Sequence, residues 1–227
     1  KFDKKKNKKI KLINLIVKKM IIILKKNDMS VTSWLEETLK TYINDLAASP
    51  YSLKILKILK KYFIDLDDLD HAHYTPLMDA AKYGDFETFK FLLNNTQDSK
   101  LSCKTIDTGE EFMSLSVLNK DIRILEYISK KQNSKIKTAL IDFNQYFSES
   151  SISKISGNLN KYTYNNKNKK FLLKRIKLLN AIFPLKKYVH TLFNQIECID
   201  IKLANKIIDI FEHKETIYCN DIIGYNF

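Results

Sequence analysis

The stretch HYTPLMDAAKYGDFETFKFLLNN, residues 73–95, holds one of the four glycines and one of the three prolines in a chain of 227 residues. The Thr75 hydroxyl can cap a helix, and Pro76 then stands in the first turn, where a missing N–H costs nothing. The small pair Ala80-Ala81 lets a neighbouring helix approach closely. We expect Gly84 to end this helix in a backbone conformation that only glycine adopts cheaply.

A second helix is predicted directly after that glycine. Apolar residues recur there at helical spacing, which is typical of a buried helix face: Phe86, Phe89, Leu92 and Leu93. The whole stretch therefore predicts two short antiparallel helices packed tightly together.

The same pattern recurs on both sides of this stretch. An offset of 33 residues leads back to Ala47-Ala48 and to a second-helix face at Leu53, Leu56 and Leu59. An offset of 36 leads forward to Gly109 in the hairpin, Met113, the small pair Ser116-Val117, and a face at Ile122, Leu125 and Ile128. The three extra residues fall in the connecting loop, so these segments predict three consecutive helix-pair units.

The text TPLMDAA, followed by GDFETFKFLL, resembles the ankyrin repeat, whose TPLHxAAxxG box precedes a second apolar helix. The resemblance implies an all-α solenoid of stacked helix pairs with degenerate or capping helices at both ends. It also implies a protein-protein interaction scaffold that binds through a concave face made of hairpin tips and first helices, without chemistry. We expect a monomer that binds a protein partner.

Three regions are predicted along the chain. Residues 1–28 form a lysine-rich segment, either a helix or a leader, and residues 29–130 hold the three repeats. Residues 131–227 hold degenerate repeats or a helical cap, with a basic polar insertion near 157–170. Within this last region we expect a degenerate fourth repeat around Thr138 and Leu140, a longer helix that stops before Pro184, and two short helices that meet near Asp200.

The resemblance also implies which residues contact the partner. In the ankyrin family these positions flank the box and follow the alanine pair. Tyr74 and Tyr83 are the expected anchors, because tyrosine supplies contact area at low entropic cost. The central and following repeats offer His71, Ala72, Tyr74, Lys82, Tyr83, Asp107, Thr108, Glu110, Leu118 and Asn119, and the preceding repeat offers Thr41, Ser49 and Pro50.

The formal net charge of +13 raises a second hypothesis, nucleic-acid binding. A basic, acid-free segment with interleaved aromatic residues could hold single strands or RNA loops. Only Arg123 and Arg175 are arginines, however, and the lysine bias is typical of AT-rich coding, which favours a solvated helix face. The candidate residues are Lys161, Lys167, Lys169, Lys170, Lys174, Arg175 and Lys177.

Enzymatic chemistry is not predicted. Phosphate-loop, dinucleotide, zincin and nucleophile-elbow motifs are all missing from the sequence. His71 and His73 lie beside Asp68 and Asp70, but an exposed hairpin tip is the better interpretation than a metal site. We therefore expect no cofactor and no metal. A third hypothesis is that the chain belongs to a larger effector or toxin with its catalytic domain elsewhere.

The cysteines bear on the compartment. Cys103, Cys198 and Cys219 are odd in number and widely spaced, as in reduced cytosolic proteins. The apolar run near the N-terminus is interrupted by lysines, so no transmembrane helix is predicted. We expect a cytoplasmic protein, or one delivered to a host cytosol.

Overall fold

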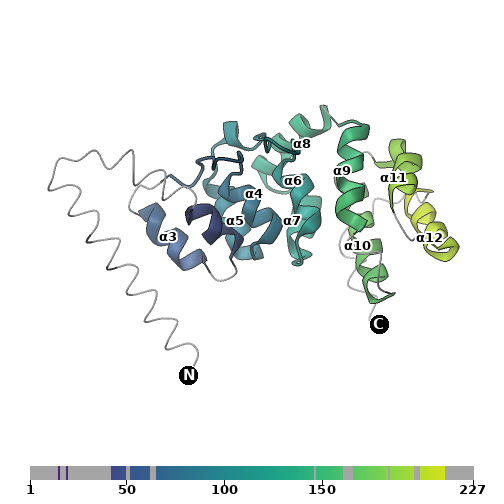
Figure 1. The fold of residues 1–227 in the computed structure, drawn as a ribbon, viewed down its shortest axis with the longest axis horizontal. Coiled ribbons are helices and arrows are strands. Elements are labelled where there is room, and N and C mark those ends of the chain that lie inside the picture. The colour runs from purple at the N-terminus through teal and green to yellow at the C-terminus, as the bar shows by residue number, and fades with distance from the viewer. Residues whose placement is uncertain are drawn as a thin grey trace, which may run out of the picture. The chain divides into compact units, whose positions relative to one another are not determined.

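The structure is a computed structural model that describes residues 42–49, 52–61, 65–145, 147–160, 166–183, 185–196 and 200–212, together with Leu15 and Lys19. These residues form α- and 3-10 helices joined by loops, and no strand occurs among them (Figure 1). The expected all-α class is thus confirmed for this part of the chain. Two compact units divide it, residues 1–109 and 110–227, and each is described by itself.

The first unit contains a helix at 42–48, α3 (Leu53–Lys61), α4 (Pro76–Tyr83), α5 (Phe86–Asn95) and the 3-10 helix η1 (Asp98–Lys100). α5 packs against both α4 and α3. Its core includes the predicted second-helix positions Leu56, Leu59, Phe89, Leu92 and Leu93, each at most 1% exposed.

The ends of α4 confirm the predicted cap. Thr75 Oγ1 accepts a hydrogen bond from the Met78 amide at 3.2 Å, and Met78 Sδ accepts one from the Thr75 amide at 3.4 Å. This is a reciprocal capping box in which a thioether takes the place of the usual carboxylate. Pro76 occupies the first turn, as expected.

The reason for the glycine at position 84 differs from the expectation. Gly84 has φ −73° and ψ 175°, an extended conformation that any residue adopts. Space is what requires glycine, because a Cβ at this position would lie 2.6 Å from the carbonyl oxygen of Ala47 and 2.8 Å from Ala80 Cα. Glycine is therefore needed at position 84 because α4 ends against the backbone of the 42–48 helix. The backbone conformation of Gly84 does not require glycine.

The second unit contains α6 (Phe112–Leu115), η2 (Ser116–Leu118), α7 (Arg123–Ser129), α8 (Ser134–Gln145), α9 (Glu149–Asn160), α10 (Asn166–Ile182), η3 (Leu185–Tyr188), α11 (Val189–Gln195) and α12 (Ile201–Glu212). α9 packs on α6 and η2, and α11 packs on α9. In parallel, α10 packs on α7, and α12 packs on α10. Successive helix pairs in this unit thus each contact the preceding pair.

That packing changes where the fourth helix pair lies. It was expected around Thr138, but the pair that packs on α6–α7 is α9 with α10. Thr138 lies inside α8, exposed, and its hydroxyl donates to the Ser134 carbonyl, so it caps nothing. α8 is an extra helix in the connection between α7 and α9. The long helix before Pro184 and the two short helices meeting near Asp200 are present as predicted.

Local geometry repeats at the predicted offset of 36 residues. His73 and Gly109, 36 residues apart, both adopt a left-handed conformation, with φ 60° and 59°. The helix caps Thr75 and Glu111 have the same separation, and so do the first helical residues Pro76 and Phe112. His73 thus stands where the next segment has its hairpin glycine.

Several expectations fall at the margins of the described residues. The lysine-rich segment 1–28 lies outside them apart from Leu15 and Lys19, as do Thr41, Pro50, Cys198 and Cys219. Of the polar insertion near 157–170, residues 157–160 end α9 and residues 166–170 begin α10. Cys103 is a free thiol. Within the described part, no helix has the length and apolarity needed to cross a membrane.

Candidate partner-binding surface

The first tip, residues 70–74, is a tightly bonded turn before α4. Asp70 Oδ1 accepts hydrogen bonds from the amides of Ala72 at 2.9 Å and Tyr74 at 2.8 Å. The amides of His73 and Asp70 close the turn, each at 3.0 Å, on the carbonyls of Asp70 and Tyr74. One aspartate therefore fixes most of the backbone of this tip.

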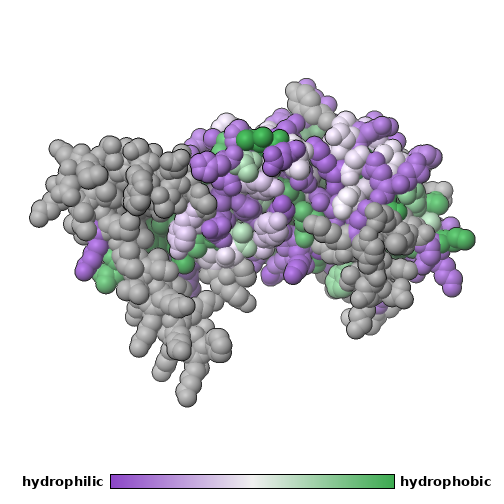
Figure 2. Space-filling model, viewed as in Figure 1, coloured by the Kyte–Doolittle hydropathy of each residue, from purple (hydrophilic) through white to green (hydrophobic). Residues whose placement is uncertain are grey.

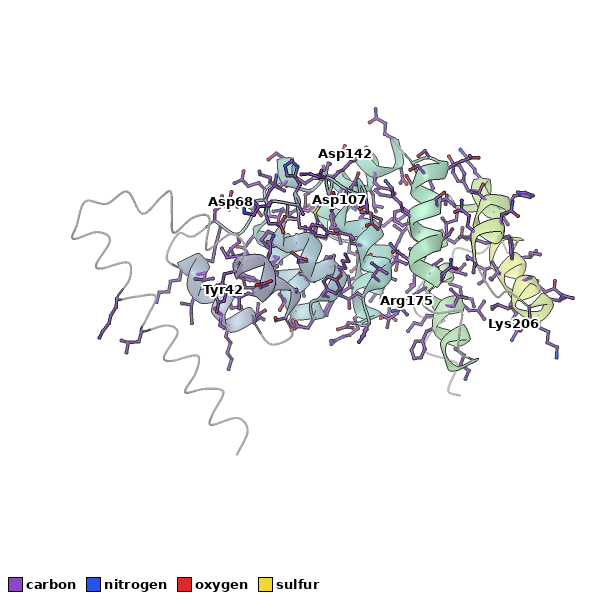
Figure 3. The ribbon with its side chains drawn as sticks, viewed as in Figure 1. Tyr42, Asp68, Asp107, Asp142, Arg175 and Lys206 are labelled. Carbon is purple, nitrogen blue, oxygen red and sulfur yellow. The ribbon has the colours of Figure 1, made fainter. Side chains whose placement is uncertain are left out.

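The second tip, residues 105–109, lies beside the first. The Ile106 amide donates to the Ala72 carbonyl at 3.2 Å, and the Gly109 amide donates to the Thr105 carbonyl at 3.0 Å. In Figure 3 the labelled Asp68 and Asp107 lie on loops at the same edge of this unit. The Ile106 side chain is 58% exposed, so an apolar residue projects from a hydrogen-bonded pair of turns.

A lysine lies between two tyrosine rings along α4. Lys82 Nζ lies 5.1 Å from the ring centroid of Tyr74 and 5.0 Å from that of Tyr83. It also donates to the Tyr74 hydroxyl at 3.1 Å. Cation–π contacts of this kind hold the three side chains in one arrangement. Tyr83 remains 58% exposed.

We call the residues linked by these contacts the tip surface. They are Ala72, Tyr74, Lys82, Tyr83 and Ile106. The predicted residues His71, Asp107 and Thr108 are exposed next to it. Figure 2 shows that hydrophilic residues cover most of the visible face of the described part, with apolar residues in small groups. Ile106 is one of several exposed apolar side chains, and Ile141 and Ile201 are more exposed, at 69% and 80%.

The other predicted contact residues lie elsewhere. Glu110 and Asn119 belong to the second unit and are 8% and 3% exposed. Glu110 accepts a hydrogen bond from Asn158 Nδ2 at 2.9 Å, and Asn119 Oδ1 accepts one from the Asp121 amide at 2.7 Å. Both side chains are therefore structural residues of the second unit, which differs from the predicted contact role. Leu118 is half-buried in the same unit, and Ser49 is exposed in the first unit.

Two acceptor groups at the base of the first tip have no hydrogen-bond donor among the described residues. Asn44 is 4% exposed; its Nδ2 donates to the Tyr74 carbonyl at 3.0 Å, but its Oδ1 accepts nothing. The partly buried Asp79 carboxylate forms neither a hydrogen bond nor an ion pair there. Burial, reinforced by the negative charges of Asp70 and Asp45, raises the pKa of Asp79 to about 7 despite the opposing charge of Lys82.

The alternative nucleic-acid set is only partly on the surface. Arg175, labelled in Figure 3, is 2% exposed, and its guanidinium donates to the carbonyls of Val117, at 3.3 Å, and Asn119. Lys174 pairs with Glu126 at 2.6 Å. Arg175 is therefore a structural residue and not a phosphate ligand. Lys170, Lys177 and the aromatic Phe171 are exposed, whereas Lys161 and the side chains of Lys167 and Lys169 lie outside the described residues.

No metal centre emerges in the described part of the chain, where no three His, Cys, Asp or Glu side chains are grouped to hold an ion. His71 and His73 are both exposed on the first tip. The two histidines are close in sequence because both belong to the turn at residues 70–74.

Sequence reasoning missed three residues of this region: Ile106, Asp79 and Asn44. Two of them left a signal. Ile106 is an apolar residue in the polar loop text KTIDTGE, and Asp79 is a charged residue inside the apolar box TPLMDAA. Asn44 left none, because its role depends on a hydrogen bond to a residue 30 positions away.

Comparisons of the chain with protein-family models, with curated proteins and with solved structures find no match. Function is therefore inferred from the chain's own residues and their geometry.

Proposed function

We propose that this protein is a non-enzymatic scaffold that binds a protein partner through the tip surface of its first unit. The observation that carries the proposal is the pair Tyr83 and Ile106. Each is 58% exposed. The Lys82 ammonium lies over the Tyr83 ring, and the backbone of Ile106 is hydrogen-bonded to Ala72. Aromatic and aliphatic side chains held in this way are typical anchors of protein interfaces.

Preorganisation supports this assignment. Asp70 fixes the first tip, the Ile106–Ala72 hydrogen bond joins the second tip to it, and Lys82 holds Tyr74. A surface whose side chains are already ordered loses less entropy on binding. Loops fixed to a helical framework are also where binding residues concentrate.

An ankyrin-type repeat array is the architecture that we propose for this scaffold. Its support is the recurrence of caps and left-handed residues at a spacing of 36, together with pair-on-pair packing in the second unit. Nearest-neighbour packing is the rule in such arrays.

A pull-down from cell lysate with the full chain tests the proposed function. Tyr83→Ala should abolish capture of a protein partner, whereas Phe171→Ala, which removes a ring of similar exposure (54%) from α10, should leave it intact. Capture should survive physiological salt, because the contact is largely apolar. Equal capture by both variants would contradict the proposal.

Nucleic-acid binding by α10 is the second candidate, and it now rests on exposed Lys170, Phe171 and Lys177. The same pull-down distinguishes it. Nucleic acid would be recovered at low salt, lost at physiological salt because phosphate contacts are screened, and reduced by Phe171→Ala.

A further inference from the structure

The last described helix of the second unit, α12, has a wider apolar face than its described contacts bury. It packs on α10, and its residues that are at most 5% exposed are Leu203, Ile207 and Phe211. Ile201, Ala204 and Ile208 lie on the flank of this buried face, since residues three and four apart share one side of a helix. Ile201 is 80% exposed, Ile208 is 36% exposed, and Ala204 is half-buried. Figure 2 shows apolar residues at the surface in the part of the chain that Figure 1 labels α12.

The apolar arc of α12 is as wide as that of a helix with two neighbours. From Ile210 round to Ile201, apolar residues occupy about half of the circumference of α12, but the buried ones occupy only about a quarter. α10 is the comparison, because it packs on both α7 and α12. Its buried residues, which occupy nearly half of its circumference, are Leu172, Arg175, Ile176, Leu178, Leu179 and Ile182. Among the described helices, α10 is the one on which α12 packs extensively.

The packing order of this unit gives the flank a meaning. The pair α6–α7 is covered by α9 with α10, and α10 is covered in turn by α12. Where each pair covers the one before it, the last pair needs a polar outer face. The flank of α12 carries isoleucines instead, so a further segment is expected to pack on it.

The segment within reach is residues 213–227, HKETIYCNDIIGYNF, which lies outside the described residues and follows α12 directly in the sequence. Seven of these fifteen residues are apolar or aromatic, and Lys214 is the one lysine. A segment that stays in water would carry fewer apolar and more charged residues. After a short turn, the remaining residues are long enough to run along the whole of α12, which spans about 18 Å.

We propose that residues 213–227 fold back on α12 and cover the flank formed by Ile201, Ala204 and Ile208. The apolar contact comes from Ile217, Tyr218, Ile222, Ile223, Tyr225 and Phe227. This segment is then the outer cap of the second unit, and its role is independent of the tip surface on the first unit.

Hydrogen-exchange mass spectrometry of the full chain tests this contact. The amides of residues 213–227 should exchange slower by about tenfold or more than those of an unstructured peptide of the same sequence. Ile201→Ser should remove most of this protection. Ile141→Ser is the matched control, because it replaces an isoleucine that is 69% exposed on α8, and it should leave the protection intact. No protection in the wild type, or equal exchange in the two variants, would overturn the inference.

Thermal unfolding gives an independent readout. Ile201→Ser should lower the Tm by several degrees, and Ile141→Ser should change it little. A variant with both Ile222→Ser and Ile223→Ser should lower the Tm as well. Combined with Ile201→Ser, its effect should not add, because a segment that is already detached has no contact left to lose. Additive losses would show that residues 213–227 do not lie on α12.

A second copy of the chain is the alternative occupant of the flank. Sedimentation velocity of the full chain over a range of concentrations distinguishes the two. If residues 213–227 cover the flank, wild type and Ile201→Ser sediment alike at every concentration. A dimer that Ile201→Ser dissociates would overturn the inference and assign the flank to self-association.

Discussion

At the residue scale, two residues of the first unit affect its packing and its stability. Gly84 lies where the end of α4 passes the Ala47 carbonyl, and Asp79 introduces a carboxylate into an otherwise apolar helix start. The first residue serves packing. The second lowers the stability of the folded protein when its carboxylate is ionised, because burial disfavours the charged form.

Replacing Gly84 tests the packing account. Gly84→Ala should destabilise the protein by about 1–3 kcal/mol, because the new methyl group meets backbone atoms that cannot move aside. Gly157→Ala is the matched control: nothing lies within 4 Å of its added methyl group inside α9. Alanine should stabilise that helix by about 0.5–1 kcal/mol. Urea denaturation measures both, and a neutral Gly84→Ala would contradict the close approach.

Asp79 predicts a pH dependence of stability. Its folded pKa of about 7 lies above its ordinary value of 3.8, so between these values the folded state holds a proton that the unfolded state has released. Its contribution to the unfolding free energy should therefore fall as pH rises from about 4 to 7, by at most about 4 kcal/mol, and stay low above pH 7.

Asp79→Asn should remove this dependence and stabilise the protein at pH 8 relative to wild type. Asp98→Asn, an exposed aspartate in η1, is the control and should behave as wild type. The measurement is urea denaturation at pH 4 and pH 8. Parallel pH profiles for wild type and Asp79→Asn would show that the carboxylate is better solvated than its surroundings indicate.

At the element scale, the link between α10 and the end of η2 depends on Arg175. The carbonyls of Val117 and Asn119 lie at the end of a 3-10 helix, where backbone acceptors lack partners, and a cation is favourable there. A lysine-biased chain that keeps an arginine at this position does so for geometry, because an ammonium cannot reach two carbonyls in the way that a guanidinium fork does.

Replacing each arginine by lysine distinguishes the buried anchor Arg175 from the exposed ion pair of Arg123. Arg175→Lys should cost about 2–3 kcal/mol in unfolding free energy, because a buried charge loses one of its charged hydrogen bonds. Arg123→Lys should cost less than about 1 kcal/mol, because its ion pair with Asp121 is exposed. Thermal and urea unfolding measure the difference, and similar costs for both would contradict the anchoring role.

Sequence patterns at this scale predicted α4 and α5 closely, because caps, proline and apolar spacing are local signals. They misplaced the fourth helix pair, since α8 carries its own apolar face of Ile136, Ala139, Leu140 and Phe143 and looks like a repeat helix. They also assigned Arg175 to a basic surface, because its burial is determined by partners 56 and 58 residues away. Contacts over such separations leave no periodic trace.

At the scale of the whole molecule, we expect different residues of the first unit to serve stability and partner binding. Leu93→Ala removes a side chain that is 0% exposed and should cost about 2–5 kcal/mol. Tyr83→Ala removes an exposed ring and should stay within about 1 kcal/mol of wild type while abolishing partner capture. Differential scanning calorimetry of both variants checks this, and unfolding of Tyr83→Ala would show that the ring belongs to the core.

The central claim is that partner binding takes place on the tip surface. Hydrogen-exchange mass spectrometry of the full chain, alone and with its captured partner, tests it most directly. The account predicts added protection at residues 70–74, 82–83 and 105–109, with α10 unchanged. Protection confined to α10, with the two tips exchanging as in the free protein, would contradict it and assign binding to the basic helix.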